Sequence, residues 1–434
     1  MIRNIDLLRL RHIAFYVLLF ISFSVTGCSS SDPQSAQDPK QEEPEVVNTD
    51  IVVAENKIFK HPGLLHTEED FNRMKVNLEL EPWKSGWNKL RSNSHSSADY
   101  IMKGPTARII RGGGSKEVPE GDNYRAAMED AHAAYLTAIS WKVTGDVRYA
   151  DKSIQILNAW AKTCKEIAGD SNRALGAGIY GYEFANAAEI MRDYKNWNAQ
   201  DFETFKKWMV DVFYKVNYEF LETHWNSCDT HYWANWDLCN IASVMSIAVL
   251  ADDIVKYKYA VNYLMKGKGN GQLIKAINYI HPKSSNDDIE LGQIQESGRD
   301  QGHTLMVIGL LGTIGQTAYN QGDDIYGYRD NMILKAAEYA AKYNIARLNV
   351  PFTKYDNCDH IEDLPHSVPS EESRGNIRPI WERIYNHYTK KKGIAARYIL
   401  MARNTTAPEG GSGEYDPNSG GYDDLGFGTF LYSR

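Results

Sequence analysis

The stretch from residue 124 to residue 167 decides the fold: YRAAMEDAHAAYLTAISWKVT (124–144), GD (145–146) and VRYADKSIQILNAWAKTCKEI (147–167). Apolar residues recur at helical spacing over 124–143, and Gly145-Asp146 is a typical stop signal. A second helix is expected over 149–167, with Ile154, Leu157 and Trp160 on one face. The two segments predict an antiparallel helical hairpin with a short, glycine-containing link.

The same periodicity continues along the chain, whereas period-2 alternation over strand length is scarce. Near the start, Thr67-Glu68-Glu69-Asp70 is close to a capping box and opens a helix. Hairpins repeated around a chain favour an all-α fold, an (α/α) toroid or incomplete α/α barrel, although no repeat in the sequence proves it. Further helices are expected at 179–194, 201–223, 237–250, 254–267, 304–320, 328–343 and 377–388.

The N-terminus has the features of a secretory signal. Three arginines precede a short apolar run over 13–25, and Thr26-Gly27-Cys28 follows at once. We expect a signal peptide over 1–27, with Cys28 as the lipidated first residue of a lipoprotein. The alternative is a plain signal peptide with an incidental cysteine.

The segment from 28 to 60 is acidic, polar and almost free of aromatic residues, so it is expected to be a disordered tether. One domain over 61–434 would follow it. These features predict a protein anchored through lipid, in the periplasm or at the outer-membrane surface. Its oligomeric state stays open.

The net charge limits the classes of ligand, and the cysteine spacing limits the kinds of disulfide or metal site. The net charge is −8, from 48 basic and 56 acidic residues, which does not suit a nucleic-acid binder. An anionic sugar would therefore need basic groups gathered in a cleft. The cysteines after Cys28 fit neither a disulfide framework nor a zinc pattern, so buried free thiols are expected, with a Cys228–Cys358 bridge as an alternative.

Three polar clusters lie between the predicted helices, where sites are commonly found. None is a specific motif by spacing alone. The clusters are Ser171-Asn172-Arg173, Asp229-Thr230-His231-Tyr232-Trp233-Ala234-Asn235-Trp236 and Glu296-Ser297-Gly298-Arg299-Asp300-Gln301-Gly302-His303.

These residue types suit the β-elimination of a uronate. The C5 proton lies beside a carboxylate, which arginine or amide groups must neutralise before a base can remove that proton. An acid must then protonate the leaving O4 oxygen, and histidine and tyrosine suit the two proton transfers. No metal or cofactor is required.

Each residue also has a purely structural interpretation. His231 and Trp233 could belong to the core, and Glu296 with Arg299 could be an architectural ion pair. Asn172 could cap a turn, and Tyr422, in the glycine-rich segment before the C-terminus, could simply pack.

Several stretches resemble the alginate lyase superfamily, and within it the bacterial and fungal proteins grouped as polysaccharide lyase family thirty-eight. The likeness spans about residues 61–430. The stretches include HPGLLHT (61–67), DAHAAY (130–135), GYEFANAAE (181–189), HYWANWD (231–237), ESGRDQGH (296–303) and GYDDLGFGT (421–429).

The resemblance implies an α/α toroid and lyase action on β-1,4-linked polyuronate, either alginate or glucuronan. His231 and Arg299 match the family's histidine and arginine. The asparagine expected before the histidine is Thr230 here, and the tyrosine expected after the arginine is absent. A catalytic tyrosine must therefore come from elsewhere, with Tyr422 the first candidate and Tyr180 the second.

These observations give one mechanistic hypothesis. Asn172, Asn235 and Arg299 neutralise the carboxylate. His231 or His303 is the base, and a tyrosine is the acid. An inverting glycoside hydrolase that uses Glu296 and Asp300 is the second interpretation, and a non-catalytic glycan-binding lipoprotein is the third. The site residues comprise catalytic His231, Arg299, His303, Tyr422 and Tyr180, and substrate-binding Asn172, Arg173, Trp233, Asn235 and Glu296.

Overall fold

The computed structural model describes residues 50–285, 287–359, 366–415 and 420–434. The predicted signal peptide, Cys28 and most of the predicted tether lie outside these residues. Within them, no helix combines the length and the hydropathy needed to cross a membrane.

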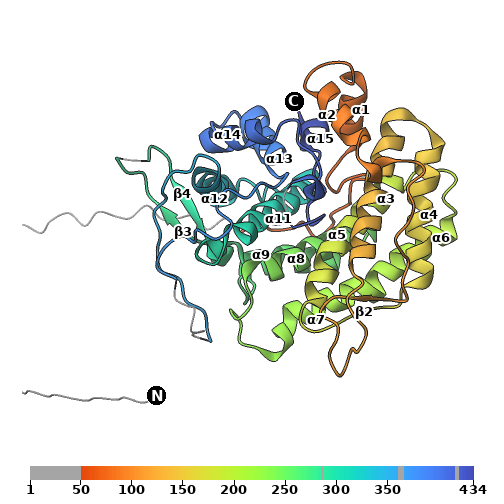
Figure 1. Ribbon diagram of the computed structural model, residues 1–434, viewed down its shortest axis with the longest axis horizontal. Coiled ribbons are helices and arrows are strands. Elements are labelled where there is room, and N and C mark those ends of the chain that lie inside the picture. Colours follow the sequence, from red (N-terminus) through yellow and green to blue (C-terminus); the bar gives the residue numbers. More distant parts are fainter. Residues whose placement is uncertain (1–49, 286, 360–365, 416–419) are drawn as a thin grey trace, which may run out of the picture. The chain divides into compact units, whose positions relative to one another are not determined.

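The domain is built from an inner set of helices, each packed against a helix of an outer set (Figure 1). The inner helices α5, α8 and α11 are buried over almost their whole length, because they contact neighbours on every side. The inner helices are α3 (Arg125–Thr144), α5 (Arg173–Met191), α8 (Ala234–Leu250), α11 (Gln301–Asn320) and the short α13 (Trp381–Tyr385).

The outer helices are amphipathic. In α4 the residues Ala150, Ser153, Leu157 and Trp160 are buried at helical spacing, while the opposite face is solvated. The outer elements are α4 (Val147–Thr163), α6 (Ala199–Trp208) with the π-helical η2 (Met209–Tyr214) and α7 (Lys215–Thr223), α9 (Ile254–Lys266), α12 (Tyr328–Asn344) and α14 (Arg397–Thr406).

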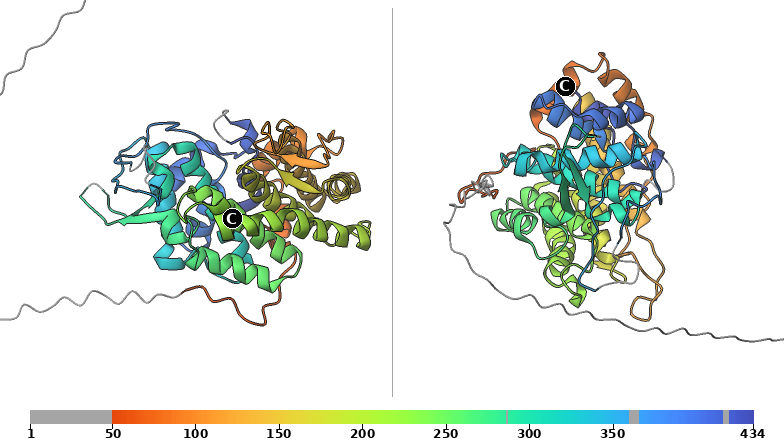
Figure 2. Two further views of the ribbon diagram at one scale, coloured as in Figure 1. Left: turned by 90° about the horizontal axis from the view of Figure 1, so that it is seen from below. Right: turned by 90° about the vertical axis from the view of Figure 1, so that its left-hand side faces the viewer.

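Smaller elements cover the ends of this arrangement, and Figure 2 shows them from two further directions. The strand β1 (Arg108–Ile110) pairs in parallel with β2 (Glu166–Ala168), and β3 (Ile277–His281) pairs antiparallel with β4 (Leu291–Ile294). The short helices are α1 (Glu68–Val76), α2 (Trp83–Arg91), α10 (Leu273–Ala276), α15 (Gly428–Tyr432), η1 (Ser94–Ser96), η3 (His224–Asn226), η4 (Gln295–Gly298), η5 (Asn386–Lys391) and η6 (Ser412–Glu414).

The predicted toroid of helical hairpins is confirmed, and the differences are local. The capping box at Thr67 is present and begins α1. The helix expected over 149–167 ends at Thr163, because the following residues pair with β1. The helix expected from 377 begins at Trp381, since Pro379 keeps its neighbours out of the helical conformation. The strands and the helices α2 and α14 were not predicted.

The ordered domain begins before the predicted boundary at residue 61. Val53 and Phe59 are already buried in the core, and Lys57 pairs with Asp323 at 2.9 Å. The tether predicted over 28–60 is therefore too long at its C-terminal end.

The prediction of buried free thiols is confirmed for two cysteines and wrong for the other two. Cys164 and Cys239 are buried free thiols, as predicted. Cys228 and Cys358 form a disulfide, so the alternative pairing is the correct one for them.

The helices α5 and α8 approach each other so closely that a side chain is excluded at Gly178. A Cβ atom there would lie 2.3 Å from Cys239 Sγ and 2.8 Å from the Cys239 carbonyl carbon. The glycines at the start of α5 therefore allow the close packing on which the inner helices depend.

We expect Gly178→Ala to lower the free energy of unfolding by roughly 1–3 kcal/mol, because the added methyl group overpacks the contact. Urea denaturation measures this effect. Gly121→Ala is the matched control, since no atom lies within 4 Å of a Cβ built there. Equal stabilities of the two variants would contradict the close-packing argument.

Candidate active site

The first turns of α5, α8 and α11 meet at one end of the domain. Because inner and outer helices alternate in antiparallel pairs, the inner helices run in the same direction and their partially positive N-termini collect there. A cavity of about 300 Å³, here named the central cavity, opens between them. Its polar lining includes Arg111, Asn235, Asp300, His303, Arg378 and Asp423.

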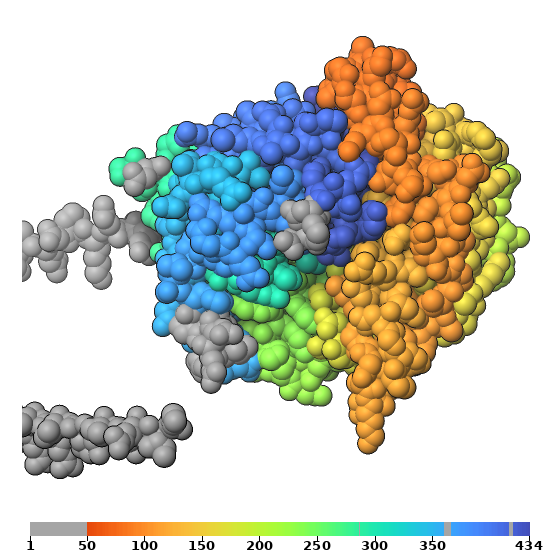
Figure 3. Space-filling model, viewed as in Figure 1, coloured from red at the N-terminus to blue at the C-terminus, as the bar shows by residue number. Residues whose placement is uncertain are grey.

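The face shown in Figure 3 brings together segments that are far apart in the sequence. Orange, green and deep-blue surfaces all lie on it. The lining of the central cavity draws on the same three parts of the chain, with Arg111, Asn235 and Asp423.

His303 lies in the first turn of α11 and faces the central cavity. Its Nδ1 lies 2.6 Å from Asp300 Oδ2, and Asp300 also caps α11 by accepting from the His303 backbone N–H. Burial alone would raise the pKa of Asp300, but the bonds from His303 and the charge of Arg299 hold it below its usual value. An ionised Asp300 can only accept, so neutral His303 carries its proton on Nδ1 and presents a free Nε2.

Asn235 lies in the first turn of α8 and is 1% exposed. Among the described residues its Oδ1 has no hydrogen-bond partner, and its Nδ2 has only the sulfur of Met306 at 3.6 Å. Buried amides are almost always satisfied, so an unsatisfied one in a cavity wall indicates a place for a ligand.

Glu296, Arg299 and Trp233 form a network beside this wall. Glu296 is fully buried, accepts from the Asn235 backbone N–H at 2.8 Å and pairs with Arg299 at 3.1 Å. Arg299 lies over the ring of Trp233, 5.1 Å from its centroid. The second and third sequence clusters are thus joined as predicted, with Glu296 in a supporting position behind Asn235.

Glu296 and Asp300, the two carboxylates that a glycoside hydrolase would use, both form structural contacts. The two oxygens of Glu296 bind Asn235 and Arg299, and Asp300 holds both the α11 N-terminus and His303. The geometry does not favour a pair of carboxylates acting on a glycosidic bond.

Arg111 is placed by the parallel pairing of β1 with β2. Its backbone N–H donates to Ala168, and Gly169 passes so close that a Cβ there would lie 1.8 Å from the Arg111 carbonyl oxygen. The Arg111 guanidinium donates to the hydroxyl of Tyr180 at 3.0 Å and lies 4.8 Å from the ring centroid of Tyr124. Burial raises the pKa of Tyr180 well above its usual value despite the neighbouring charge, so the phenol stays protonated.

Asp423 lies on the opposite side of the central cavity, on the glycine-rich C-terminal segment. It is surrounded by Arg111, Arg378 and His303, although burial outweighs their charges and raises its pKa. Arg378 pairs with the next residue, Asp424, at 3.1 Å. The described residues of the glycine-rich C-terminal segment, from 420 onward, therefore pack into the site.

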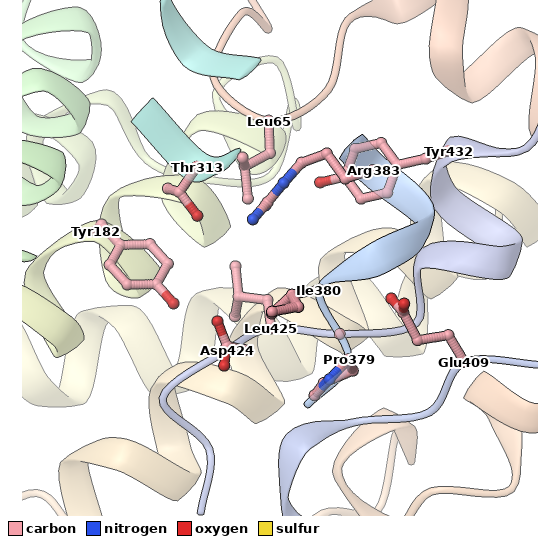
Figure 4. Close-up of a pocket in the computed structure, with 11 residues that line it drawn as sticks. Leu65, Tyr182, Thr313, Pro379, Ile380, Arg383, Glu409, Asp424, Leu425 and Tyr432 are labelled. Atoms are coloured by element: carbon pink, nitrogen blue, oxygen red, sulfur yellow. The ribbon is translucent and has the colours of Figure 1, made fainter. Parts of the chain in front are cut away.

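An enclosed cavity lies behind this segment, and Figure 4 shows its lining. Arg383 donates from it to the Gly309 carbonyl at 2.8 Å, and Tyr182 donates to the Asp423 carbonyl at 2.5 Å. Burial and the neighbouring Glu382 raise the pKa of Glu409 to about 8. This polar interior fixes the C-terminal segment against the inner helices.

Tyr422, the first candidate for the catalytic tyrosine, points elsewhere. Its ring packs against His95 and His132, with centroids 4.5 Å and 4.7 Å away. Of the two predicted tyrosines, Tyr180 is the one that contacts a residue of the cavity wall.

His231 lies on the loop before α8, where it bonds through Nδ1 to Asp359. The disulfide between Cys228 and Cys358 joins the same two loops, and the Cys358 backbone N–H donates to Thr230 at 3.0 Å. His231 is thus oriented by a carboxylate, as His303 is, but it is not among the residues that line the central cavity.

Asn172 and Arg173 stand at the start of α5, outside the central cavity lining. The Asn172 amide donates to Asp170 at 2.8 Å, which matches its structural interpretation as a turn residue. Arg173 stacks on Trp225 and lines a different cavity.

A family model described as alginate lyase matches residues 87–349. The chain belongs to the alginate lyase family. The predicted enzyme class, a polysaccharide lyase, is confirmed with it. A comparison with curated proteins finds no significant match.

Solved alginate lyases share the fold of this family member at low sequence identity. An alginate lyase from Bacteroides ovatus is 14% identical, with a TM-score of 0.56 over 86% of this chain and 99% of its own. Alginate lyase A1-III from Sphingomonas species A1 is 16% identical, with a TM-score of 0.53 over 86% and 97%. A histidine-to-alanine variant of A1-III, complexed with a tetrasaccharide, is 15% identical with a TM-score of 0.52 over the same shares.

Arg111, Arg378 and Asp423 were missed as site residues. Arg111 precedes three glycines in a segment without helical periodicity, and Arg378 precedes a proline. Both are positions where a loop is held rigidly beside a helix N-terminus, and that signal could have drawn attention to them.

Near Asp423 and Asp424, α5 carries the fully buried Glu183, whose carboxylate forms no ion pair with the described residues. Burial and the charges of Asp423 and Asp424 raise the pKa of Glu183 well above its usual value. The folded state therefore binds a proton that the unfolded state releases above about pH 4.5.

We expect this group to stabilise the protein fully below that pH and to lose its contribution as the pH rises toward the folded-state pKa. The slope approaches about 1.4 kcal/mol per pH unit in this window. Glu183→Gln should remove it and raise the thermal midpoint relative to the parent at pH 8 but not at pH 4. The exposed Glu69→Gln is the control, and parallel pH profiles for all three proteins would contradict the argument.

Proposed function

We propose that this chain depolymerises a β-1,4-linked polyuronate, either alginate or glucuronan, by β-elimination in the central cavity. The observation that carries the proposal is the unsatisfied buried amide of Asn235, which shares a cavity with an oriented histidine and Arg111. An amide, a guanidinium and an imidazole are the groups that this reaction needs around one sugar acid.

In the proposed reaction, Asn235 and Arg111 bind the carboxylate of the uronate and disperse the charge that develops when C5 is deprotonated. Nε2 of His303 removes the C5 proton, while Asp300 stabilises the imidazolium that forms. The electron pair of the C5–H bond becomes the C4=C5 double bond, and the C4–O4 bond breaks. The leaving O4 oxygen takes its proton from solvent in the open cavity, and Tyr180, fully buried behind the wall and bonded to Arg111, holds that guanidinium in place.

Incubation with polymannuronate, polyguluronate and glucuronan tests the reaction, because each elimination creates an unsaturated sugar that absorbs in the ultraviolet. We expect absorbance to rise with at least one of the three polymers. No rise with any of them would contradict lyase activity, and new reducing ends without absorbance would indicate hydrolysis instead.

Replacement of each histidine tests the assignment of the base. We expect His303→Ala to lower kcat by about 10²–10⁴-fold, the usual contribution of general base catalysis. His231→Ala removes the other carboxylate-oriented histidine and should reduce kcat by less than about tenfold, since its ring is outside the cavity lining. The reverse order of the two losses would transfer the role of base to His231.

We also propose that the mature protein is a lipoprotein anchored through Cys28, on the periplasmic side or the outer-membrane surface. The lipobox and the polar segment after it support this, and both lie outside the described residues. Cys28→Ala should move the protein from the membrane fraction to the soluble fraction and abolish labelling with a fatty-acid probe. Identical fractionation and labelling of the parent and the variant would contradict the anchor.

A further inference from the structure

A second cavity, of about 360 Å³, is lined by β2 and by residues of the η2–α7 segment. It is separated from the central cavity by the first turn of α5. Arg173 lines this second cavity and Leu175 lines the central one. Residues two apart in a helix face different sides, so the two cavities flank the N-terminus of α5.

The guanidinium of Arg173 has an unusual environment in the wall of this cavity. It lies 3.7 Å from the ring centroid of Trp225 and donates only a long bond, of 3.3 Å, to the Gly169 carbonyl. Among the described residues, no carboxylate lies within ion-pair distance of it. A guanidinium stacked flat on an indole keeps its N–H edges available for a planar, bidentate acceptor such as a carboxylate.

Trp225 is held under Arg173 by a strained turn. His224, Trp225 and Asn226 have φ values of 42°, 52° and 66°, three consecutive left-handed residues of which none is glycine. His224 is fixed there by Asp237 at 2.9 Å and by Tyr263 at 3.3 Å. Such strain persists where the surroundings enforce it, and it is common at binding sites.

Tyr232 belongs to the surroundings of Arg173, because its phenol is close enough to interact with Ser171 and with the charge of Arg173. Four acids and three basic residues line the cavity. Two of the acids, Glu166 and Asp211, are already paired with Arg108 and Lys207.

We propose that the stacked pair of Arg173 and Trp225 binds the carboxylate of a uronate residue remote from the bond that is cleaved. The polymer passes over the N-terminus of α5, with one sugar acid in the central cavity and another at Arg173. The inference rests on the proposed function, and it adds a second anionic subsite that favours long substrates.

The chain-length dependence of the kinetics tests the subsite. Arg173→Gln should raise KM about tenfold for an oligouronate hexasaccharide, leave its kcat unchanged, and leave KM for a trisaccharide unchanged. Arg173→Lys keeps the positive charge but lacks the planar arrangement of N–H donors. It should therefore reverse less than half of the rise in KM. Arg148→Gln, at an exposed arginine of α4, is the matched control.

A direct binding measurement separates this proposal from the lyase assignment. Titration of the His303→Ala variant, which should not cleave the hexasaccharide, should quench tryptophan fluorescence, and adding Arg173→Gln to that variant should weaken the binding about tenfold. In an active enzyme, an equal rise in KM for the hexasaccharide and the trisaccharide, or no rise for either, would contradict the proposed subsite. If the parent produced no unsaturated sugar, the proposed function would fail, and the titration alone would decide whether Arg173 binds the oligosaccharide.

Discussion

The alternation of inner and outer helices is the constraint on which the rest of the structure depends. Because each outer helix returns the chain to the same end, the helices α5, α8 and α11 all begin there, and the close packing at Gly178 keeps their first turns together. Side chains in the first turn of each helix then face one cavity. The positive ends of the helix dipoles add to the attraction for an anionic sugar.

This arrangement explains how an acidic protein can bind a polyanion. The net charge of −8 would repel the polymer at long range, and the basic groups near the central cavity are balanced by acids such as Asp423 and Asp424. In the proposed site, recognition depends on the Asn235 amide, the Arg111 guanidinium and Nε2 of His303, which line the cavity.

Periodicity in the sequence was sufficient to predict the toroid, since long buried or amphipathic helices leave a clear apolar pattern. It also drew attention to Asn235 and His303, which lie within a few residues of helix starts and line the central cavity, whereas Arg299 lies beside the wall. The position of Tyr422 was predicted less well, as the direction of a side chain in a glycine-rich segment depends on tertiary packing against His95 and His132. The arginines of the cavity come from segments distant in sequence, Arg111 after β1 and Arg378 before α13, and no local pattern relates such segments to each other.

The central claim is that one sugar acid is held between Asn235 and Arg111 with its C5 facing His303. A crystal structure of the His303→Ala variant soaked with an oligouronate tests this claim most directly. The account predicts a uronate carboxylate within hydrogen-bond distance of the Asn235 amide and the Arg111 guanidinium. Sugar density that leaves this cavity empty while occupying another face of the domain would contradict it.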